Sequence, residues 1–168
     1  MKKSHIIMLF LGLSYFNATA QTADEYYTKA KNLELLQDDK AAIKEYSKAI
    51  QKEPKFEKAY IARAAVENRL KKYNDALIDF NSAIAINPKS FKSYFLRAKT
   101  KTIVMDYAGA VKDLDQSIEY NDKYSSAYNE RAQVKLLLSD REGACEDLNK
   151  AASLGFPYSF DFIENKCE

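Results

Sequence analysis

The chain has 168 residues, 26 basic and 24 acidic side chains, one histidine and two cysteines. This charge balance gives no support for nucleic-acid binding, which needs a basic surface against phosphates. Two cysteines are too few for a structural zinc site, and His5 lies in a leader that we expect to be removed, so no Ser-His-Asp or Cys-His site is expected. We therefore expect a non-enzyme with no catalytic residue, no metal and no cofactor.

Residues 1–20 have the pattern of a secretory signal peptide. Lys2 and Lys3 form a basic start, an apolar run covers residues 6–16, and small residues at 18–20 precede Gln21. The run is shorter than the roughly 20 residues that cross a bilayer as a helix, so a retained anchor is the less favoured alternative. We expect cleavage after residue 20 and an exported protein without membrane insertion. The expected location is the periplasm, with the extracellular space as the alternative.

From residue 23 onward the sequence repeats at a fixed period, in the units 23–56, 57–90, 91–124 and 125–158. In each unit a tyrosine precedes an alanine by four residues, as Tyr26 precedes Ala30. A second stripe places an alanine four residues before a large apolar side chain, as Ala76 precedes Phe80. Both stripes have helical spacing, so each unit is predicted to be an antiparallel pair of helices.

The breaks between the predicted helices also repeat. Asp38, Asp106 and Asp140 are expected to cap the second helices, with Asn74 taking that role in the second unit, where the shared position holds Lys72. Thr22 and Glu25 can form a capping box at the start of the first helix. Pro54 and Pro88 end a helix and mark the passage from one unit to the next.

These units resemble the tetratricopeptide repeat family, whose 34-residue unit has an aromatic, small residues, a second aromatic and a proline in this order. Tyrosine replaces the family's tryptophan here, and the family's tyrosine in the eleventh column is missing. The ending "GACEDLNKAASLGFP" is similar to the last repeats of exported bacterial members. The resemblance implies an all-α fold, a right-handed α-solenoid of four helix-turn-helix units. We also expect a C-terminal capping helix over 159–168, beginning near Pro157, because a repeat array needs its last apolar face covered.

A basic column is matched by an acidic column sixteen residues later. The pairs are Lys29 with Glu45, Arg63 with Asp79, Arg97 with Asp113, and Arg131 with Asp147. We interpret them as ion pairs that join the two helices of each unit, which for arginine can be bidentate. The alternative is a row of basic groups that read a ligand in the groove.

The two cysteines lie in the last unit and the tail. Cys145 occupies a column otherwise held by Ile43, Leu77 and Val111, which is expected to face the following unit, where Cys167 follows at the apolar spacing of the tail. In an oxidising exported compartment we expect a Cys145–Cys167 disulfide. Two buried thiols are the alternative.

In the family, the first helices of successive units line a concave groove that takes peptides or protein segments. The positions that correspond here are candidates for partner binding: Tyr27, Lys31, Ile61, Phe95, Lys99, Asn129 and Gln133. They suit a segment with hydrophobic side chains and some acidic character, unless the aromatic residues only pack against their neighbours. The family's lysine and asparagine clamp for C-terminal carboxylates is not supported, since only Lys92 matches it.

The sequence therefore predicts a non-catalytic scaffold of the bacterial cell envelope that binds a protein or peptide segment. The alternative is a self-associating structural protein with an idle groove, in which a homo-oligomer forms through the convex face or an exposed end.

Overall fold

The computed structural model describes residues 21–157 and residue 167. In this part of the chain all regular secondary structure is helical, and eight helices of 13 or 14 residues follow one another. Their bounds are α1 (Ala23–Leu35), α2 (Asp39–Lys52), α3 (Glu57–Arg69), α4 (Tyr73–Ile86), α5 (Phe91–Ile103), α6 (Tyr107–Tyr120), α7 (Ser125–Leu137) and α8 (Arg141–Ser153). The expected leader and all but one residue of the expected capping helix lie outside the described residues.

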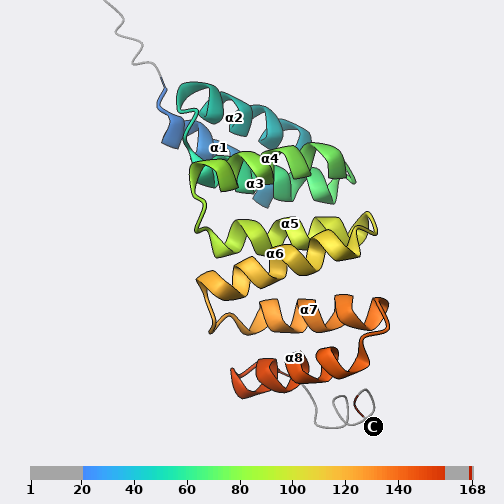
Figure 1. Ribbon diagram of the computed structural model, residues 1–168. Helices are drawn as coiled ribbons and strands as arrows, with labels where there is room; N and C mark the ends of the chain where they lie inside the picture. The colour runs from blue at the N-terminus through green and yellow to red at the C-terminus, as the bar shows by residue number, and fades with distance from the viewer. Residues whose placement is uncertain (1–20, 158–166, 168) are drawn as a thin grey trace, which may run out of the picture.

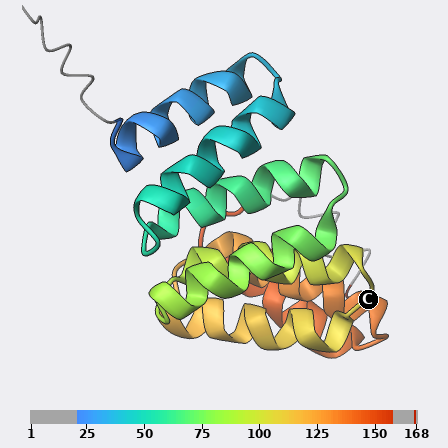
Figure 2. The ribbon, with the colours of Figure 1, turned by 90° about the horizontal axis from the view of Figure 1, so that it is seen from above.

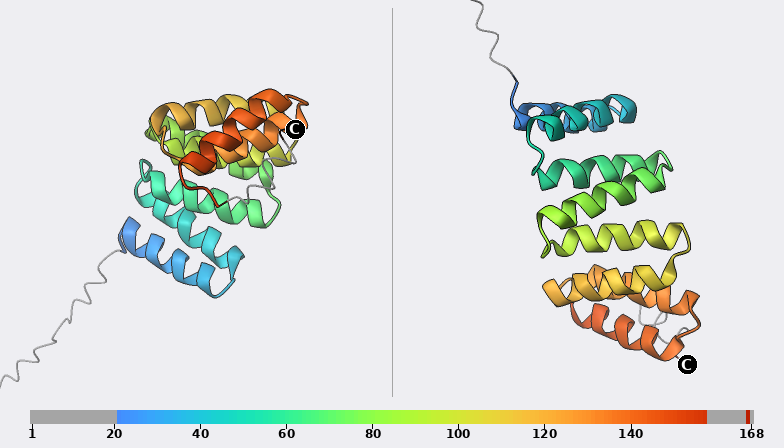
Figure 3. Two further views of the ribbon diagram at one scale, coloured as in Figure 1. Left: turned by 90° about the horizontal axis from the view of Figure 1, so that it is seen from below. Right: turned by 45° about the horizontal axis from the view of Figure 1, so that its top comes forward.

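The helices form four antiparallel pairs that stack in chain order from α1 and α2 to α7 and α8 (Figures 1 and 3). Each odd-numbered helix packs on the even-numbered helix that follows it, and α3, α5 and α7 also pack on the even-numbered helix before them. Direct contacts also join α3 to α5 and α5 to α7. The odd-numbered helices therefore line the inner side of an all-α solenoid, and the even-numbered helices form its outer side.

The core follows the two stripes read from the sequence. The alanines of both stripes are fully buried, and so are Tyr46, Phe80 and Leu114, while Leu148 is 1% exposed. Small side chains let two helix backbones approach closely, and the large ones fill the wider space beside them. The repeating core is thus built from several small residues and one large residue at fixed positions in each unit.

Four turns between odd- and even-numbered helices share one conformation. A residue with positive φ stands in each of them: Gln37, Lys71, Met105 and Ser139. The following amide donates to a carbonyl five residues back, as from Asp38 to Leu33 at 3.0 Å. This is the Schellman arrangement, which satisfies carbonyl groups at the end of a helix.

The predicted caps are present with one exception. Asp38, Asp106 and Asp140 accept hydrogen bonds from the amides three residues on at 3.0–3.1 Å, and Thr22 and Glu25 form the capping box. The prediction for Asn74 is wrong, because Lys72 occupies the cap position of α4 and no side chain caps that helix. The chain enters α4 with the same backbone geometry as the other even-numbered helices, so only an acceptor oxygen is lacking.

Supplying that oxygen should stabilise the protein. We expect Lys72→Asn to raise the free energy of unfolding by about 1 kcal/mol relative to Lys72→Ala, because both variants lose the same charge and only asparagine can accept a bond from the first turn. Urea denaturation of the two variants gives the difference. Equal midpoints would show that α4 begins without need of a cap.

Candidate partner-binding groove

One stripe on the odd-numbered helices remains available after packing. Their positions against the paired helix, such as Ala64 and Ala98, and against the preceding unit, such as Ala59 and Val66, are fully buried. The remaining stripe, which we call the inner stripe, repeats every three or four residues on the inner side. Its members are Tyr27 and Lys31 on α1, Lys58 and Ile61 on α3, Lys92, Phe95 and Lys99 on α5, and Asn129 and Gln133 on α7.

The structure divides the seven predicted groove residues by exposure. Lys31, Lys99 and Gln133 are exposed, Tyr27, Ile61 and Asn129 are half-buried, and Phe95 is only 9% exposed. The polar members of the inner stripe are thus the ones that solvent, and hence a partner, can reach.

The aromatic members are largely engaged in packing. The ring centroid of Tyr27 lies 5.6 Å from that of Tyr46 and 5.3 Å from that of Phe56. Phe95 packs edge-on against Tyr124 at 5.0 Å. Tyr124 and Phe56 belong to the turns between units, so these contacts fasten the inner stripe to the next unit. Packing, the alternative weighed from the sequence, accounts for Phe95 and for much of Tyr27.

Basic side chains dominate the centre of the inner stripe. Lys58, Lys92 and Lys99 are exposed, and none of them forms an ion pair with another described residue. Lys92 and Lys99 extend over the rings of Phe91 and Phe95, with 5.8 and 5.7 Å from nitrogen to centroid. The sequence prediction missed Lys58, which lies three residues before Ile61 as Lys92 lies three before Phe95. Burial raises the pKa of the Glu130 carboxyl on α7, and the charge of Lys99 acts against that shift, so Lys99 has one acidic group within electrostatic range. Positive charge without a close ion pair therefore gathers on α3 and α5.

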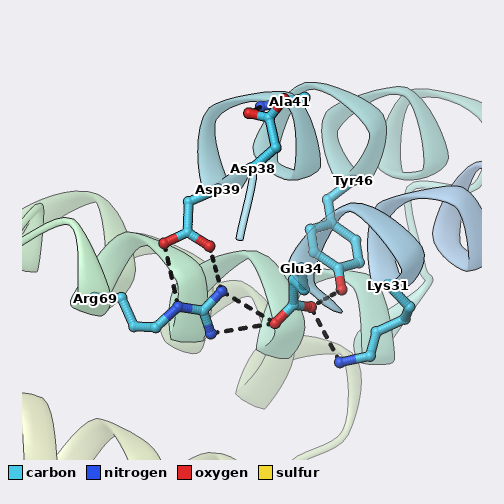
Figure 4. A network of polar contacts seen from close by, with 7 residues as sticks. All are labelled: Lys31, Glu34, Asp38, Asp39, Ala41, Tyr46 and Arg69. Carbon is cyan, nitrogen blue, oxygen red and sulfur yellow. Dashed lines mark hydrogen bonds and ion pairs between the residues drawn. The ribbon is translucent and has the colours of Figure 1, made fainter. Parts of the chain in front are cut away.

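In the first unit, Lys31 of the inner stripe belongs to a network of polar contacts that also includes Arg69 of α3 (Figure 4). Lys31 donates to Glu34 at 3.0 Å, and Arg69 of α3 bridges Glu34, at 3.2 Å, and Asp39, at 2.5 Å. The hydroxyl of Tyr46 also donates to Glu34. Burial opposes ionisation of Glu34, but the hydrogen bonds from Tyr46, Lys31 and Arg69 outweigh it and hold the pKa of its carboxyl below the usual value. Lys31 therefore has a close ion pair within its own helix, unlike the three lysines of α3 and α5.

Comparison with known proteins relies on structure, because neither a family model nor a curated protein sequence matches the chain. The crystal structure of MamA superposes with a TM-score of 0.78 and 17% identity over 86% of this chain and 78% of that one. A tetratricopeptide repeat protein from Parabacteroides merdae gives 0.79 and 20% over 89% and 60%. The first TPR domain of Spaghetti (RPAP3), bound to the HSP90 peptide SRMEEVD, gives 0.69 and 25% over 74% and 98%.

The protein has the tetratricopeptide-repeat (TPR) fold. The fold expected from the repeat period is thereby confirmed. In the described ranges 21–157 and 167, acidic, histidine and cysteine side chains do not gather into a group that could hold a metal ion. A search of the same residues finds no helix with the length and apolarity of a membrane span.

The arginines of the TPR array are structural. Arg63, Arg97 and Arg131 bind Asp79, Asp113 and Asp147 through two parallel hydrogen bonds of 2.5–2.8 Å. Their guanidinium groups lie between helices with side chains only 17–20% exposed. The looser pair of the first unit, Lys29 with Glu45, spans 3.5 Å. The interpretation of these columns as ion pairs that join the two helices of a unit is therefore confirmed, and the arginines are not free to contact a ligand in the groove.

Each arginine makes a further bond that sequence comparison missed. Its third nitrogen, Nη1, donates to the even-numbered helix of the preceding unit at 2.7–2.8 Å, and the acceptors are Ser47, Asn81 and Asp115 in turn. The three acceptors are different residue types that each supply an oxygen at the same repeat position. Comparing residue types between the four units therefore did not reveal them. The arginines thus fasten neighbouring units together as well as the two helices within a unit.

The second unit breaks a charge pattern that the third and fourth units share. Lys101 and Lys135 place their amino groups 2.9 Å from Asp113 and Asp147. The same position on α3 holds Glu67, which is 7% exposed and has one carboxylate oxygen without a partner among the described residues. Burial, followed by the charge of Asp79, raises the pKa of Glu67 to about 7. A buried acidic group therefore replaces a cation that elsewhere neutralises the aspartate.

At the end of the array a disulfide joins Cys145 of α8 to Cys167, with 5.5 Å between the Cα atoms. Cys167 packs against the buried cluster of Ala132, Ala144 and Leu148. This contact ties the tail at residue 167 to the last apolar face, which a repeat array needs to cover.

Proposed function

We propose that the protein is a non-catalytic scaffold whose inner stripe binds an acidic, partly apolar segment of a partner protein. The observation that carries the proposal is the group of exposed lysines on α3 and α5 that lack ion pairs with other described residues, beside the half-buried Ile61. Other basic groups of the array, such as Arg97 and Lys101, are committed to internal aspartates. Positive charge without close ion pairs along a groove favours an oppositely charged partner and speeds its association.

The structural comparison adds support by analogy. The TPR domain of Spaghetti is bound to the peptide SRMEEVD, which contains three acidic residues. We further propose that the present protein acts after export, in the periplasm, because residues 1–20 have the form of a secretory leader. Its client would then be a component of the cell envelope.

Charge reversal in the inner stripe tests this function. We expect the Lys92→Glu, Lys99→Glu variant to lose a protein that the natural chain retains from a native envelope extract, because its groove would repel an acidic segment. The matched control is Lys44→Glu, Lys112→Glu, which makes the same charge change at exposed positions of α2 and α6 on the outer side. Retained proteins are identified by mass spectrometry, and circular dichroism verifies that both variants are folded.

Equal retention by both variants would move the binding site away from the groove. Retention of nothing but further copies of the chain would favour the alternative, a self-associating protein with an idle groove. The inner-stripe variant is preferred to truncation of Tyr27 or Phe95, since loss of a packed ring would destabilise the fold by about 3 kcal/mol and confuse the result.

A further inference from the structure

Buried polar groups are paired unequally along the array. We call α1–α4 the N-terminal half and α5–α8 the C-terminal half, and these occupy opposite ends of the stack, blue to green and yellow-green to red in Figures 1 and 2. Three buried side-chain oxygens have no hydrogen-bond partner among the described residues, and all of them lie in the N-terminal half: Glu45 Oε2, Glu67 Oε2 and Asn68 Oδ1. Such groups destabilise a fold, because they have lost their hydrogen bonds to water. In the same half, α4 lacks the side-chain cap that the other even-numbered helices have.

The C-terminal half is held together by more internal bonds. Lys101 and Lys135 each complete a cluster in which one buried aspartate binds both an arginine and a lysine. Both lysines also donate to a backbone carbonyl, that of Gly109 at 3.4 Å and that of Gly143 at 3.1 Å. The disulfide adds a covalent bond at the end of this half. The two halves therefore differ in how well their interiors are stabilised.

Glu67 is the residue through which pH can act on the weaker half. It stands at the repeat position of Lys101 and Lys135, so a carboxyl group replaces an ammonium group beside the buried Asp79. When Glu67 is ionised, two anions share a buried space with Arg63 as their cation, and protonation of Glu67 removes their repulsion. Burial, followed by the charge of Asp79, raises the pKa of Glu67 to about 7, so this change takes place near neutral pH.

The charges around Glu67 are unevenly balanced. Asp75 of α4 adds to the repulsion, and Lys72, which opposes it, is exposed in the turn. The helices α2 and α5 also pack on α3. Their charged residues are either exposed lysines or already paired, namely Asp39 with Arg69, Glu45 with Lys48, and Arg97 and Lys101 with Asp113. An ionised Glu67 therefore keeps its unfavourable interaction with Asp79.

The contacts between units decide how far an opening of the second unit spreads. Arg97 crosses between the two halves to the neutral Asn81, whereas Arg131 crosses within the C-terminal half to the charged Asp115. Hydrogen bonds between two charged groups are the stronger kind. In a repeat array each unit contacts only its neighbours. When the second unit opens, the first unit therefore loses its one neighbouring unit, while the third and fourth units keep each other.

From these differences we infer that the array contains a pH-sensitive switch, in which loss of the Glu67 proton opens α1–α4 locally while α5–α8 stay folded. Lys58 and Ile61 of the inner stripe lie on the half that opens, and Lys92 and Lys99 lie on the half that stays folded. Opening therefore removes one part of the inner stripe and leaves the other in place. The switch goes beyond the proposed function, since it operates without a partner.

Native-state hydrogen exchange of the purified full chain, followed by mass spectrometry of its peptides, locates the opening. Dividing the exchange rate of an unstructured peptide by the measured rate at the same pH gives a protection factor for each helix. From about pH 5.5 to about pH 8 we expect protection in α1–α4 to fall more than about tenfold, and protection in α5–α8 to change less than about threefold. Equal losses in both halves, or constant protection in α1–α4, would overturn the inference.

Two variants test whether Glu67 is the group responsible. Glu67→Gln keeps the size of the side chain and removes its charge, so protection in α1–α4 should agree within about threefold at the two pH values. The control Glu53→Gln removes an exposed carboxyl group at the end of α2 and should show the same pH dependence as the natural chain. If Glu67→Gln lost protection with pH as the natural chain does, Glu67 would not be the switch. Hydrogen exchange involves no partner, so this inference and the proposed function can fail separately.

Discussion

Replacing Asp113 by alanine should lower the free energy of unfolding by about 3 kcal/mol, one of the largest effects expected of a charged residue in the array. Asp113 is 4% exposed, accepts two hydrogen bonds from Arg97 and forms an ion pair with Lys101. Its removal leaves two cations between α5 and α6 without their anion. Urea denaturation at neutral pH measures the loss.

Asp115 supplies the matched control on the same helix. Its side chain is 52% exposed and pairs with Arg131 from the neighbouring unit. We expect Asp115→Ala to cost less than about 1 kcal/mol, as is usual for exposed ion pairs. The double variant Arg97→Met, Asp113→Leu should be more stable than Asp113→Ala alone, since it leaves one buried cation fewer uncompensated. Equal losses from Asp113→Ala and Asp115→Ala would refute a buried origin for this stabilisation.

Glu67 should make the protein less stable as the pH rises from about 4.5 to about 7. An unfolded chain loses this proton near the ordinary value of 4.5, whereas burial and Asp79 raise the pKa of Glu67 to about 7 in the fold. Between these values the folded state holds a proton that the unfolded state has released, so the free energy of unfolding falls with pH. The full shift corresponds to about 3 kcal/mol, complete above pH 7 and absent below 4.5.

The difference between the natural protein and Glu67→Gln isolates this effect. Carboxyl groups with lowered pKa, such as Glu34 and Asp39, change stability in the opposite sense at acid pH, and they cancel in the difference. As the pH rises from about 4.5 to about 7, the free energy of unfolding of Glu67→Gln should increase relative to that of the natural chain by up to about 3 kcal/mol. Glu67→Lys, which copies Lys101 and Lys135, should be more stable than either at neutral pH. A difference that stays constant from pH 4 to pH 8 would show that Glu67 ionises normally.

The sequence predicts the architecture well because packing repeats with the period. Ala64 and Phe80 are read directly from their columns, and the pairing of Arg97 with Asp113 follows from two columns within one unit. The missed bond from Arg97 to Asn81 depends on how neighbouring units stack, and its acceptor changes from unit to unit. The cap assigned to Asn74 failed because α4 begins at the same repeat position as the other even-numbered helices, whatever residue stands there.

The candidate groove was predicted less completely. Sequence columns place Phe95 on the inner side, but its burial depends on Tyr124, which reaches it from the turn before the next unit. Exposure therefore differs between residues of one column, as half-buried Ile61 and buried Phe95 show. The sequence alone does not show which lysines lack an ion pair, because the partners of the other basic groups are known only from the structure.

Site-specific photocross-linking in the cells that produce the protein tests most directly whether the inner stripe binds a partner. A photoreactive residue in place of Lys99 on the inner side is compared with the same residue in place of Lys112 on the outer side. We predict a covalent adduct with one partner protein at position 99 and none with that partner at position 112. Adducts confined to position 112, or equal adducts at both positions, would contradict groove-mediated binding.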